Sequence, residues 1–367
     1  MWEYYSPVRI VFGPGTIREL PSLVRKSGCK KILLFSRKLE RLDAGVRDVL
    51  HSLREQTAYV VDDIRPEPDL TELNKIIEHI SGRSFDLVVA VGGGSVIDSA
   101  KAVMAGYANH ADMKDLFQHA SEFKNRLPLI AIPTTSGTGS EVTRAAALTC
   151  QGVKQPVFSD ILYPSTAIID PELTRSCPPM LTASCGFDVL AHAVESLMHR
   201  NANPISESLA KDAVRLCVKF FRQVYDCPYD AEARTAMSEA SVKAGMAIAS
   251  SGCSAAHAFS YRLSSDYGIP HGEACAFLLD GLVSLCTEYD GRMDSIAMEI
   301  GFDNGIAFSK WILELKRHMH IRNSMGEFGV AQGEEADLVS ACVDSLILKN
   351  HYFPITEEMI WKITGRF

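Results

Sequence analysis

The spacing of hydrophobic residues along this 367-residue chain changes near residue 180. Before that point, short apolar runs alternate with amphipathic segments, a pattern typical of a parallel α/β sheet. Beyond it, apolar residues recur at helical spacing with only short polar, Gly or Pro breaks. Pro178 and Pro179 punctuate the chain at the change. The pattern predicts a Rossmann-like α/β domain with a parallel sheet over residues 1–180, followed by an all-α domain over 181–367.

The first half contains apolar runs of strand length, each closed by a turn signal or by polar residues. The predicted strands are Val8–Phe12, Ile32–Phe35, Ala58–Val61, Phe85–Val91, Leu127–Ile132, Gln155–Tyr163 and Ala167–Asp170. The predicted helices of this half are Thr16–Val24, with Thr16 and Glu19 as a capping box, Leu39–Gln56 and Asp69–Ile80. In the second half, Thr182 is predicted to cap the first helix, and the helical segments lie near 183–199, 204–225, 231–250, 271–288, 304–318, 334–348 and 356–363.

Two polar turns at the ends of predicted strands indicate a ligand. The glycine run Gly92–Ser95 precedes a helix, where backbone N–H groups can approach an anion. The run lacks the Gly-x-Gly-x-x-Gly spacing, so a tight turn that binds nothing is the alternative. The second turn, 133–143, is rich in Ser, Thr and Gly, which suits ribose or phosphate contacts at the edge of an open sheet. A plain Ser/Thr loop is its alternative.

Four side chains of the second half form a candidate metal site. Asp188 and His192 are four residues apart, which places both on one helix face. His257 and His271 would lie about 21 Å apart on one unbroken helix. Gly268 and Pro270 interrupt that helix and allow the chain to fold back. One carboxylate and three imidazoles make a suitable site for a divalent metal, although buried histidines often only satisfy hydrogen bonds.

Composition excludes several classes of protein. The net charge of −8 argues against a nucleic-acid partner, and no stretch approaches the ~20 apolar residues of a membrane span. The first ten residues carry Glu3 and Arg9 and do not form a secretory signal. The ten cysteines are scattered without a Cys-x-x-Cys pair, as expected for reduced thiols. We therefore expect a cytoplasmic protein.

Six motifs in this order resemble the iron-dependent (group III) alcohol dehydrogenase family over almost the whole chain. They are Phe12-Gly13-x-Gly15, Gly92-Gly-Gly-Ser-x-x-Asp98-x-x-Lys101, the segment Pro133–Thr143, Asp170-Pro-Glu-Leu, Asp188-x-x-x-His192, and His257 with Pro270-His271-Gly272. The resemblance implies a coenzyme-binding N-terminal domain, a helical C-terminal domain and an NAD(P)-linked alcohol dehydrogenase activity. It also implies that a catalytic Fe²⁺, with Zn²⁺ as the alternative, is held by Asp188, His192, His257 and His271.

The resemblance also implies a set of coenzyme-binding residues. Gly93, Gly94 and Ser95 are expected to cradle the pyrophosphate, with Asp98 and Lys101 supporting their turn. The other positions expected to contact the coenzyme are Thr134, Thr135, Thr143, Lys154 and Leu173. After the second predicted strand, Arg37 stands where the family usually carries an acidic group for the ribose, and Lys38 follows it. These cations could bind the 2′-phosphate of NADPH, so we predict that NADPH is preferred over NADH. The alternative is that both cations only face water.

Two further departures from the family pattern concern the proton relay and the substrate. Tyr261 stands where the family often has a second histidine, and its hydroxyl is a candidate proton donor. Arg144 and Arg262 stand where relatives often carry neutral residues, which suggests an anionic substrate; structural ion pairs are the alternative. The N-terminal Trp2-x-Tyr-x-x-Pro7-Val and the His257–Glu273 segment resemble the phosphonate-associated branch, which reduces phosphonoacetaldehyde to 2-hydroxyethylphosphonate. We expect that reaction, in a homodimer.

Other functions remain open at this point. A general alcohol or lactaldehyde-type dehydrogenase would carry the same motifs. Dehydroquinate-synthase-like lyases and glycerol-phosphate dehydrogenases share the two-domain plan, but the Asp-x-x-x-His pair favours the alcohol dehydrogenase. A non-catalytic protein that binds a metal or a nucleotide is the third class.

Overall fold

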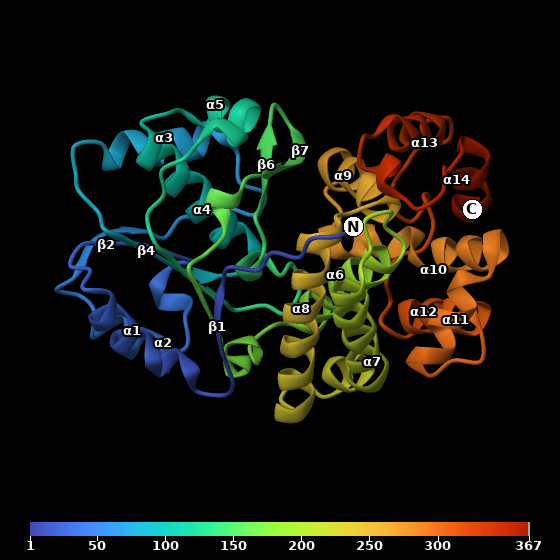
Figure 1. Cartoon of the computed structure of the whole chain (residues 1–367), viewed down its shortest axis with the longest axis horizontal. Helices are drawn as coiled ribbons and strands as arrows, with labels where there is room; N and C mark the ends of the chain where they lie inside the picture. Colours follow the sequence, from blue (N-terminus) through green and yellow to red (C-terminus); the bar gives the residue numbers. More distant parts are fainter. Residues whose placement is uncertain (366–367) are drawn as a thin grey trace. The chain divides into compact units, whose positions relative to one another are not determined.

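The computed structural model describes residues 1–365, apart from the side chain of Arg41, and the last two residues of the predicted helical domain lie outside this range. The chain forms two compact units (Figure 1). The α/β unit comprises residues 6–135 and 139–176. The helical unit runs from Cys177 onward and includes the short segments 1–5 and 136–138, which the predicted boundary placed in the first domain.

The α/β unit is built on a six-stranded sheet in which every pairing is parallel, in the order β1-β8-β5-β4-β2-β3. Its strands are β1 (Arg9–Phe12), β2 (Ile32–Ser36), β3 (Thr57–Val61), β4 (Leu87–Gly92), β5 (Leu129–Pro133) and β8 (Thr166–Ile169). The central strands β2, β4 and β5 are buried along their whole length, which explains their continuous apolar sequences. The predicted parallel α/β architecture is confirmed.

Helices cover both faces of this sheet. They are α1 (Leu20–Ser27), α2 (Ala44–His51), α3 (Leu70–Ile80), α4 (Gly94–Asn109) and α5 (Met113–His119), with short 3₁₀ turns at Thr16–Glu19, Leu39–Arg41, Ala120–Glu122, Ser140–Val142, Asp160–Leu162 and Pro171–Thr174. Alternate residues of β2 join different cores: Ile32 and Leu34 belong to the core that contains residues of α1 and α2, whereas Leu33 and Phe35 belong to the core that contains residues of α3, α4 and α5.

Two predicted helices of this unit were wrong in detail. The first begins as a 3₁₀ turn behind Gly15, and Thr16 donates its hydroxyl to the Gly13 carbonyl instead of capping the helix. The second, predicted over 39–56, is divided because Asp43 caps a new helix, α2, by accepting from the Gly45 amide. Apolar spacing alone does not reveal where a cap interrupts a helix.

A two-stranded antiparallel sheet replaces the strand predicted at 155–163. It pairs β6 (Ala145–Cys150) with β7 (Val153–Phe158). The two residues between them, Gln151 and Gly152, have φ of 52° and 78°, the positive values that a tight two-residue hairpin requires. The strand ends at Phe158, so the predicted run to Tyr163 was wrong and β6 was missed.

The second unit is helical, as predicted. Its helices are α6 (Pro179–Leu197), α7 (Pro204–Asp226), α8 (Ala231–Ser251), α9 (Ala255–Tyr267), α10 (His271–Asp290), α11 (Arg292–Ile300), α12 (Gly305–His318), α13 (Glu335–Asp344) and α14 (Glu357–Thr364), with a 3₁₀ turn at Leu348–Asn350. Helix α6 begins at Pro179, because proline is favoured in the first helical turn. Thr182 therefore lies inside the helix and accepts from Arg234, which corrects the predicted cap.

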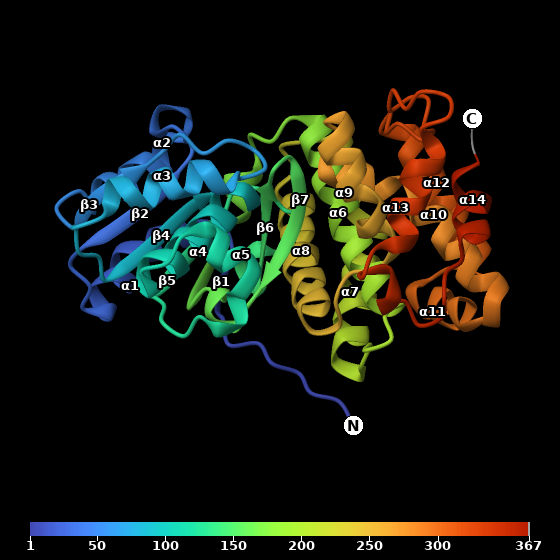
Figure 2. The same ribbon diagram turned by 90° about the horizontal axis from the view of Figure 1, so that it is seen from above.

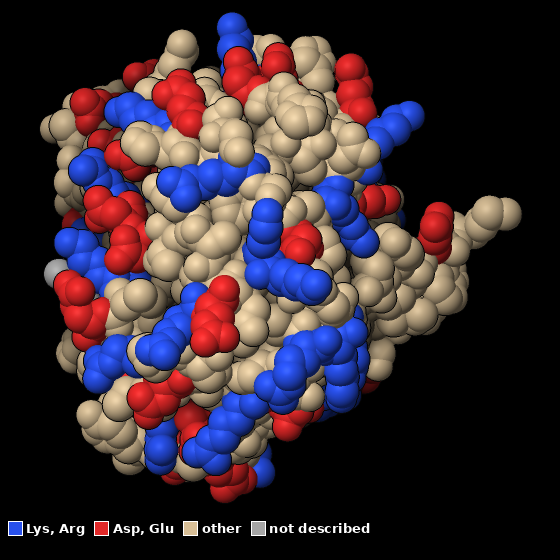
Figure 3. Space-filling model, turned by 90° about the vertical axis from the view of Figure 1, so that its left-hand side faces the viewer, with Lys and Arg blue, Asp and Glu red and all other residues tan. Residues whose placement is uncertain are grey.

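Helix α6 is the buried centre of this unit and packs against α7, α8 and α10 (Figure 2). Fifteen of its residues from Thr182 to Leu197 are buried, so the helix is enclosed on all sides. Figure 3 shows a face of the molecule on which Lys and Arg side chains are interspersed with Asp and Glu. None of the helices within residues 1–365 combines the length and hydropathy needed to cross a membrane.

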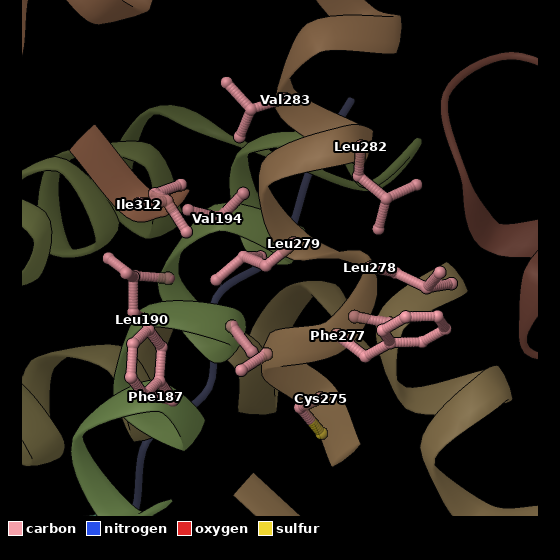
Figure 4. Close-up of a cluster of buried hydrophobic side chains, with 14 of the residues drawn as sticks. Phe187, Leu190, Val194, Cys275, Phe277, Leu278, Leu279, Leu282, Val283 and Ile312 are labelled. Atoms are coloured by element: carbon pink, nitrogen blue, oxygen red, sulfur yellow. The ribbon is translucent and has the colours of Figure 1, made fainter. Parts of the chain in front are cut away.

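The contact between α6 and α10 is filled by large apolar side chains. Figure 4 shows Phe187, Leu190 and Val194 of α6 beside Leu279 and Val283 of α10. All are fully buried. This packing holds two helices at a constant separation, and each carries residues of the candidate metal site.

Candidate functional site

The four predicted metal ligands lie together in the helical unit. Asp188 and His192 occupy successive turns of α6, His257 lies in the first turn of α9, and His271 is the first residue of α10. One carboxylate oxygen, Asp188 Oδ1, is 3.6 Å from His192 Nε2, 3.8 Å from His257 Nε2 and 3.9 Å from His271 Nε2. Three imidazoles therefore converge on one carboxylate oxygen.

The turn between α9 and α10 brings the two late histidines together. Helix α9 ends at Tyr267, and Gly268 has φ of 65°, a left-handed conformation that suits a glycine at a helix end. The chain then reverses through Pro270 into α10, and the rings of His257 and His271 lie 5.3 Å apart. The reversal predicted from Gly268 and Pro270 is confirmed.

The buried polar atoms of this cluster fit a divalent ion. Asp188 and His257 are 3% and 2% exposed, and Asp188 Oδ1 and His257 Nε2 have no hydrogen-bond partner among the described residues. An unsatisfied buried carboxylate oxygen costs several kcal/mol, by order of magnitude, unless a cation neutralises it. Burial also lowers the pKa of His192, which keeps its imidazole neutral, the form that binds a metal.

Glu195, which the motifs did not single out, holds His257 from the side opposite to the site. One of its oxygens accepts from the Ala256 amide at 2.6 Å and the His257 amide at 3.3 Å, and the other contacts His257 Nδ1. Burial alone would raise the Glu195 pKa, but the adjacent His257 keeps that pKa below its ordinary value. A carboxylate on Nδ1 places the ring proton there and leaves Nε2 free to bind a metal. Glu195 follows Asp188 by seven residues, so helical spacing places it on the same face of α6, but that spacing does not reveal its contact with His257.

Tyr261 lies beside the metal cluster. Its ring stacks on His271 at 5.9 Å and meets His257 edge-on at 6.4 Å. Burial raises the Tyr261 pKa well above its ordinary value, so the hydroxyl is protonated at neutral pH. The structure thus places the Tyr261 ring next to two of the candidate ligands.

The coenzyme residues predicted in the α/β unit gather at the carboxyl edge of the sheet. The strand order reverses between β2 and β4, because the chain continues from β2 outward to β3 and then returns to β4 on the other side. Ligands of open α/β sheets bind at such a reversal. Arg37 and Lys38 directly follow β2, and Ser36 pairs with Val91 of β4, one residue before the glycine turn. Both cations are exposed, and within residues 1–365 neither forms an ion pair.

The glycine turn leads directly into α4. Gly93 is the residue before the helix and supplies no side-chain cap, so the first N–H groups, at Gly94 and Ser95, face outward from the helix end. A Cβ on Gly92 would lie 2.5 Å from a methyl group of Val96, and one on Gly93 would lie 3.4 Å from the Thr135 hydroxyl. Glycine thus allows the close turn, and a negative charge at this helix end is favoured.

Asp98 and Lys101 of α4 form hydrogen bonds with the end of the Ser/Thr-rich turn 133–143 and the start of β6. Asp98 accepts from the Ser140 hydroxyl at 2.5 Å and the Ala147 amide at 3.0 Å. Lys101 is fully buried and donates to the carbonyls of Thr143 and Ala145. Burial raises the pKa of Asp98 and lowers that of Lys101 to about 8. These two residues therefore position residues 140–147 through buried hydrogen bonds.

Three other predicted coenzyme residues lie near the glycine turn or in the core beneath the sheet. Lys154 of β7 pairs with Glu67 at 3.3 Å, and the Glu67 amide donates to the Ser95 hydroxyl, so Lys154 is connected to the glycine turn. Thr134 donates its amide to the Gly92 carbonyl at 3.0 Å, which joins both turns. Leu173 is partly buried against the core beneath β2 and β4.

The Asp170-Pro-Glu-Leu motif has a structural role. Asp170 is buried, and its carboxylate accepts from the amides of Gly15, Ile17 and Glu172 at 3.0–3.1 Å. It therefore joins the end of β8 to the turn after β1. The motifs near residues 13–15 and 170–173, about 155 residues apart in sequence, are two halves of one hydrogen-bonded corner.

The two arginines expected at the substrate each have a carboxylate partner. Arg144 pairs with Asp160 at 3.1 Å, and Arg262 pairs with Asp266 at 2.6 Å on the same helix. All four side chains are more than a third exposed. Pairs of this kind contribute little to stability, so each arginine can leave its partner at small cost.

A parallel α/β unit with an anion-receptive glycine turn and a helical unit with four converging ligands are the two parts of a metal-dependent dehydrogenase. The comparisons with known proteins agree. Residues 7–171 match the family model "Iron-containing alcohol dehydrogenase", and residues 182–366 match "Fe-containing alcohol dehydrogenase family, C-terminal". This chain belongs to the iron-containing alcohol dehydrogenase family and is an oxidoreductase.

Individual relatives cover nearly the whole chain. Long-chain-alcohol dehydrogenase 1 of Geobacillus thermodenitrificans is 35% identical over 361 residues, covering 92% of this chain and 91% of that protein. The 1,3-propanediol dehydrogenase of Klebsiella pneumoniae is 36% identical over 76% of this chain and 74% of that protein. Among solved structures, sulfoacetaldehyde reductase from Bifidobacterium kashiwanohense in complex with NAD⁺ is 34% identical with a TM-score of 0.93, covering 100% of this chain and 98% of that chain. Membership of this family therefore supports iron as the metal and NAD(H) as the coenzyme.

Proposed function

We propose that this chain reduces a small anionic aldehyde to its primary alcohol, and that phosphonoacetaldehyde, which yields 2-hydroxyethylphosphonate, is the substrate. The observation that carries the proposal is the convergence of three imidazoles on the Asp188 carboxylate in a chain of this family. The similarity to a sulfoacetaldehyde reductase supports an anionic substrate. Sulfoacetaldehyde and phosphonoacetaldehyde are both two-carbon aldehydes that carry a tetrahedral anionic group.

The roles of the protein groups follow from their positions. Asp188, His192, His257 and His271 would hold the divalent ion, and Glu195 keeps the His257 proton on Nδ1. When bound, the ion supplies Lewis-acid polarisation of a carbonyl oxygen, and the nicotinamide supplies the hydride. Tyr261 keeps its proton at neutral pH and is a nearby O–H group that can pass one to the product alkoxide, directly or through water.

For the coenzyme, we propose that NADPH is preferred over NADH. Arg37 and Lys38 lie at the strand reversal, where the adenosine ribose is expected, and no carboxylate among the described residues neutralises them. Michaelis constants for both coenzymes test this in the unchanged protein. The variant Arg37→Ala should raise the constant for NADPH and leave that for NADH unchanged. A clear NADH preference in the unchanged protein would contradict the proposal.

For the substrate, we propose that Arg144 and Arg262 bind the anionic group. Each is replaced by Ala, and KM is measured for phosphonoacetaldehyde and for propionaldehyde, which carries no charge. The expected result is a higher KM for the anionic aldehyde only. Asp266→Asn is a matched control for Arg262, because it breaks the same ion pair but keeps the cation. An equal effect of all three variants on both aldehydes would assign these residues a structural role.

The activity itself is tested by NADPH oxidation with metal-loaded protein and a panel of aldehydes. Phosphonoacetaldehyde should give the highest kcat/KM, and sulfoacetaldehyde is the second candidate because of the structural similarity. Higher kcat/KM with uncharged aldehydes would indicate a general alcohol dehydrogenase. His257→Ala should abolish turnover and reduce bound metal. Turnover of no aldehyde by metal-loaded protein would favour a lyase or a non-catalytic protein.

A further inference from the structure

A sulfur atom lies beside the four expected ligands. Cys275 follows His271 by four residues on α10, so both side chains project from the same helix face. Its Sγ is 3.8 Å from His271 Nε2, and the residue is fully buried. In Figure 4 it stands at the start of α10, below the apolar cluster of Leu279 and Val283.

Cys275 completes a second set of four donors. Donor atoms of Asp188, His257, His271 and Cys275 all lie within 4.8 Å of one another. Three of these residues are also among the four metal ligands predicted from the sequence. The two sets differ only in whether His192 or Cys275 is the fourth member. Asp188 Oδ1 and His257 Nε2, which are buried and have no hydrogen-bond partner among the described residues, belong to both sets.

The distances suit a sulfur ligand as well as a nitrogen ligand. With metal–nitrogen bonds of about 2.0–2.1 Å and metal–sulfur bonds of about 2.3 Å, two ligands of a tetrahedral ion lie ~3.4 Å (N and N) or ~3.6 Å (N and S) apart. The separation between Cys275 Sγ and His271 Nε2, 3.8 Å, exceeds the second value only slightly. The carboxylate-to-imidazole separations, 3.6–3.9 Å, exceed the ~3.4 Å expected for oxygen and nitrogen ligands by up to about 0.5 Å.

We propose that Cys275 is a sulfur donor of the metal centre and takes the fourth position from His192 when the ion is thiophilic. On binding, the S–H bond breaks, sulfur donates an electron pair to the ion, and the proton passes to water. Zn²⁺ and Co²⁺ accept thiolate ligands readily, whereas Mn²⁺ prefers oxygen. The residue therefore shifts the metal preference of this site toward thiophilic ions. This inference rests on the proposed metal centre.

Cys253 is the competing sulfur, since it groups with His192 and His257 within the same 4.8 Å limit. That group has only three donors and does not include Asp188, so the carboxylate that neutralises the ion is absent from it. Cys286 is a matched control: it is fully buried on the same helix, but contacts His351 at 3.5 Å instead of a predicted ligand.

The test is the absorption spectrum of the Co²⁺-loaded full-length protein. A near-ultraviolet sulfur-to-cobalt charge-transfer band should appear, be lost in Cys275→Ser, and persist in Cys253→Ser, Cys286→Ser and His192→Ala. Cys275→Ser should also lower the affinity for Zn²⁺ more than that for Mn²⁺. Circular dichroism of each variant checks its fold.

The outcomes separate this inference from the proposed function. Visible ligand-field bands without the charge-transfer band in the unchanged protein would overturn the sulfur ligand and leave the metal centre intact. Persistence of the band in Cys275→Ser, or its loss in Cys253→Ser alone, would also overturn it. Absence of ligand-field bands after Co²⁺ loading would overturn the metal centre and, with it, the sulfur ligand.

Discussion

Replacing Glu195 with Gln should weaken metal binding without touching a metal ligand. The carboxylate accepts from the Ala256 and His257 amides with one oxygen and contacts His257 Nδ1 with the other. Glutamine has one oxygen and one NH₂ group. If its oxygen stays on the amides, the NH₂ group meets Nδ1 and favours the ring tautomer protonated at Nε2, which cannot bind a metal. If the glutamine amide group is flipped, its NH₂ group faces the backbone N–H groups of Ala256 and His257, which then lose their acceptor.

The magnitude follows from the position of Glu195 behind a ligand. Loss of such an outer-shell partner lowers metal affinity by about 10- to 100-fold. That range corresponds to about 1.4–2.8 kcal/mol of binding free energy. Dissociation constants for Zn²⁺ and Fe²⁺, measured by competition with a chelator, should rise by this factor. At saturating metal, kcat should recover in large part, because the four ligands are still present.

Glu273→Gln is the control for this experiment. Glu273 is also a buried carboxylate of the helical unit, but it accepts two hydrogen bonds from the Arg322 guanidinium, both at 2.8 Å, and a third from the Arg322 amide at 3.2 Å. Its replacement should lower the melting temperature and leave metal affinity unchanged. If Glu195→Gln binds Zn²⁺ as tightly as the unchanged protein, Glu195 does not orient His257.

Three further predictions concern the α/β unit. Burial raises the Glu141 pKa from 4.5 to about 7, so the folded state favours the neutral acid. The free energy of unfolding should therefore fall by up to about 3 kcal/mol as the pH rises from ~5 to ~8. Glu141→Gln should flatten that profile in denaturant titrations; parallel profiles would contradict the assignment. Asp170→Ala removes the carboxylate that accepts from three backbone amides and should lower the free energy of unfolding by about 3 kcal/mol. An unchanged denaturation midpoint would show that these hydrogen bonds do not stabilise the fold. Gly92→Ala should cost about 1–3 kcal/mol through overlap with Val96, and Val96→Ala in the same chain should restore part of the melting temperature.

The sequence alone determined the features that depend on neighbours a few residues apart. Apolar periods separated the α/β part from the helical part, and buried runs located the central strands. The four-residue spacing of Asp188 and His192, and the break at Gly268 and Pro270, predicted that four ligands could meet. In these cases the geometry of a helix or strand fixes the direction of each side chain from its position in the sequence.

Only the tertiary structure decided the contacts between distant segments. Glu195 reaches His257 across 62 residues and Asp170 reaches Gly15 across 155, and no periodicity reports such pairs. Turn geometry at Gln151 and Gly152 created a hairpin of which the apolar pattern had predicted only the second strand. Whether a charged residue meets a partner depends on which elements pack beside it. The packing of α6 against α10 likewise gave Cys275 its place among the expected metal ligands.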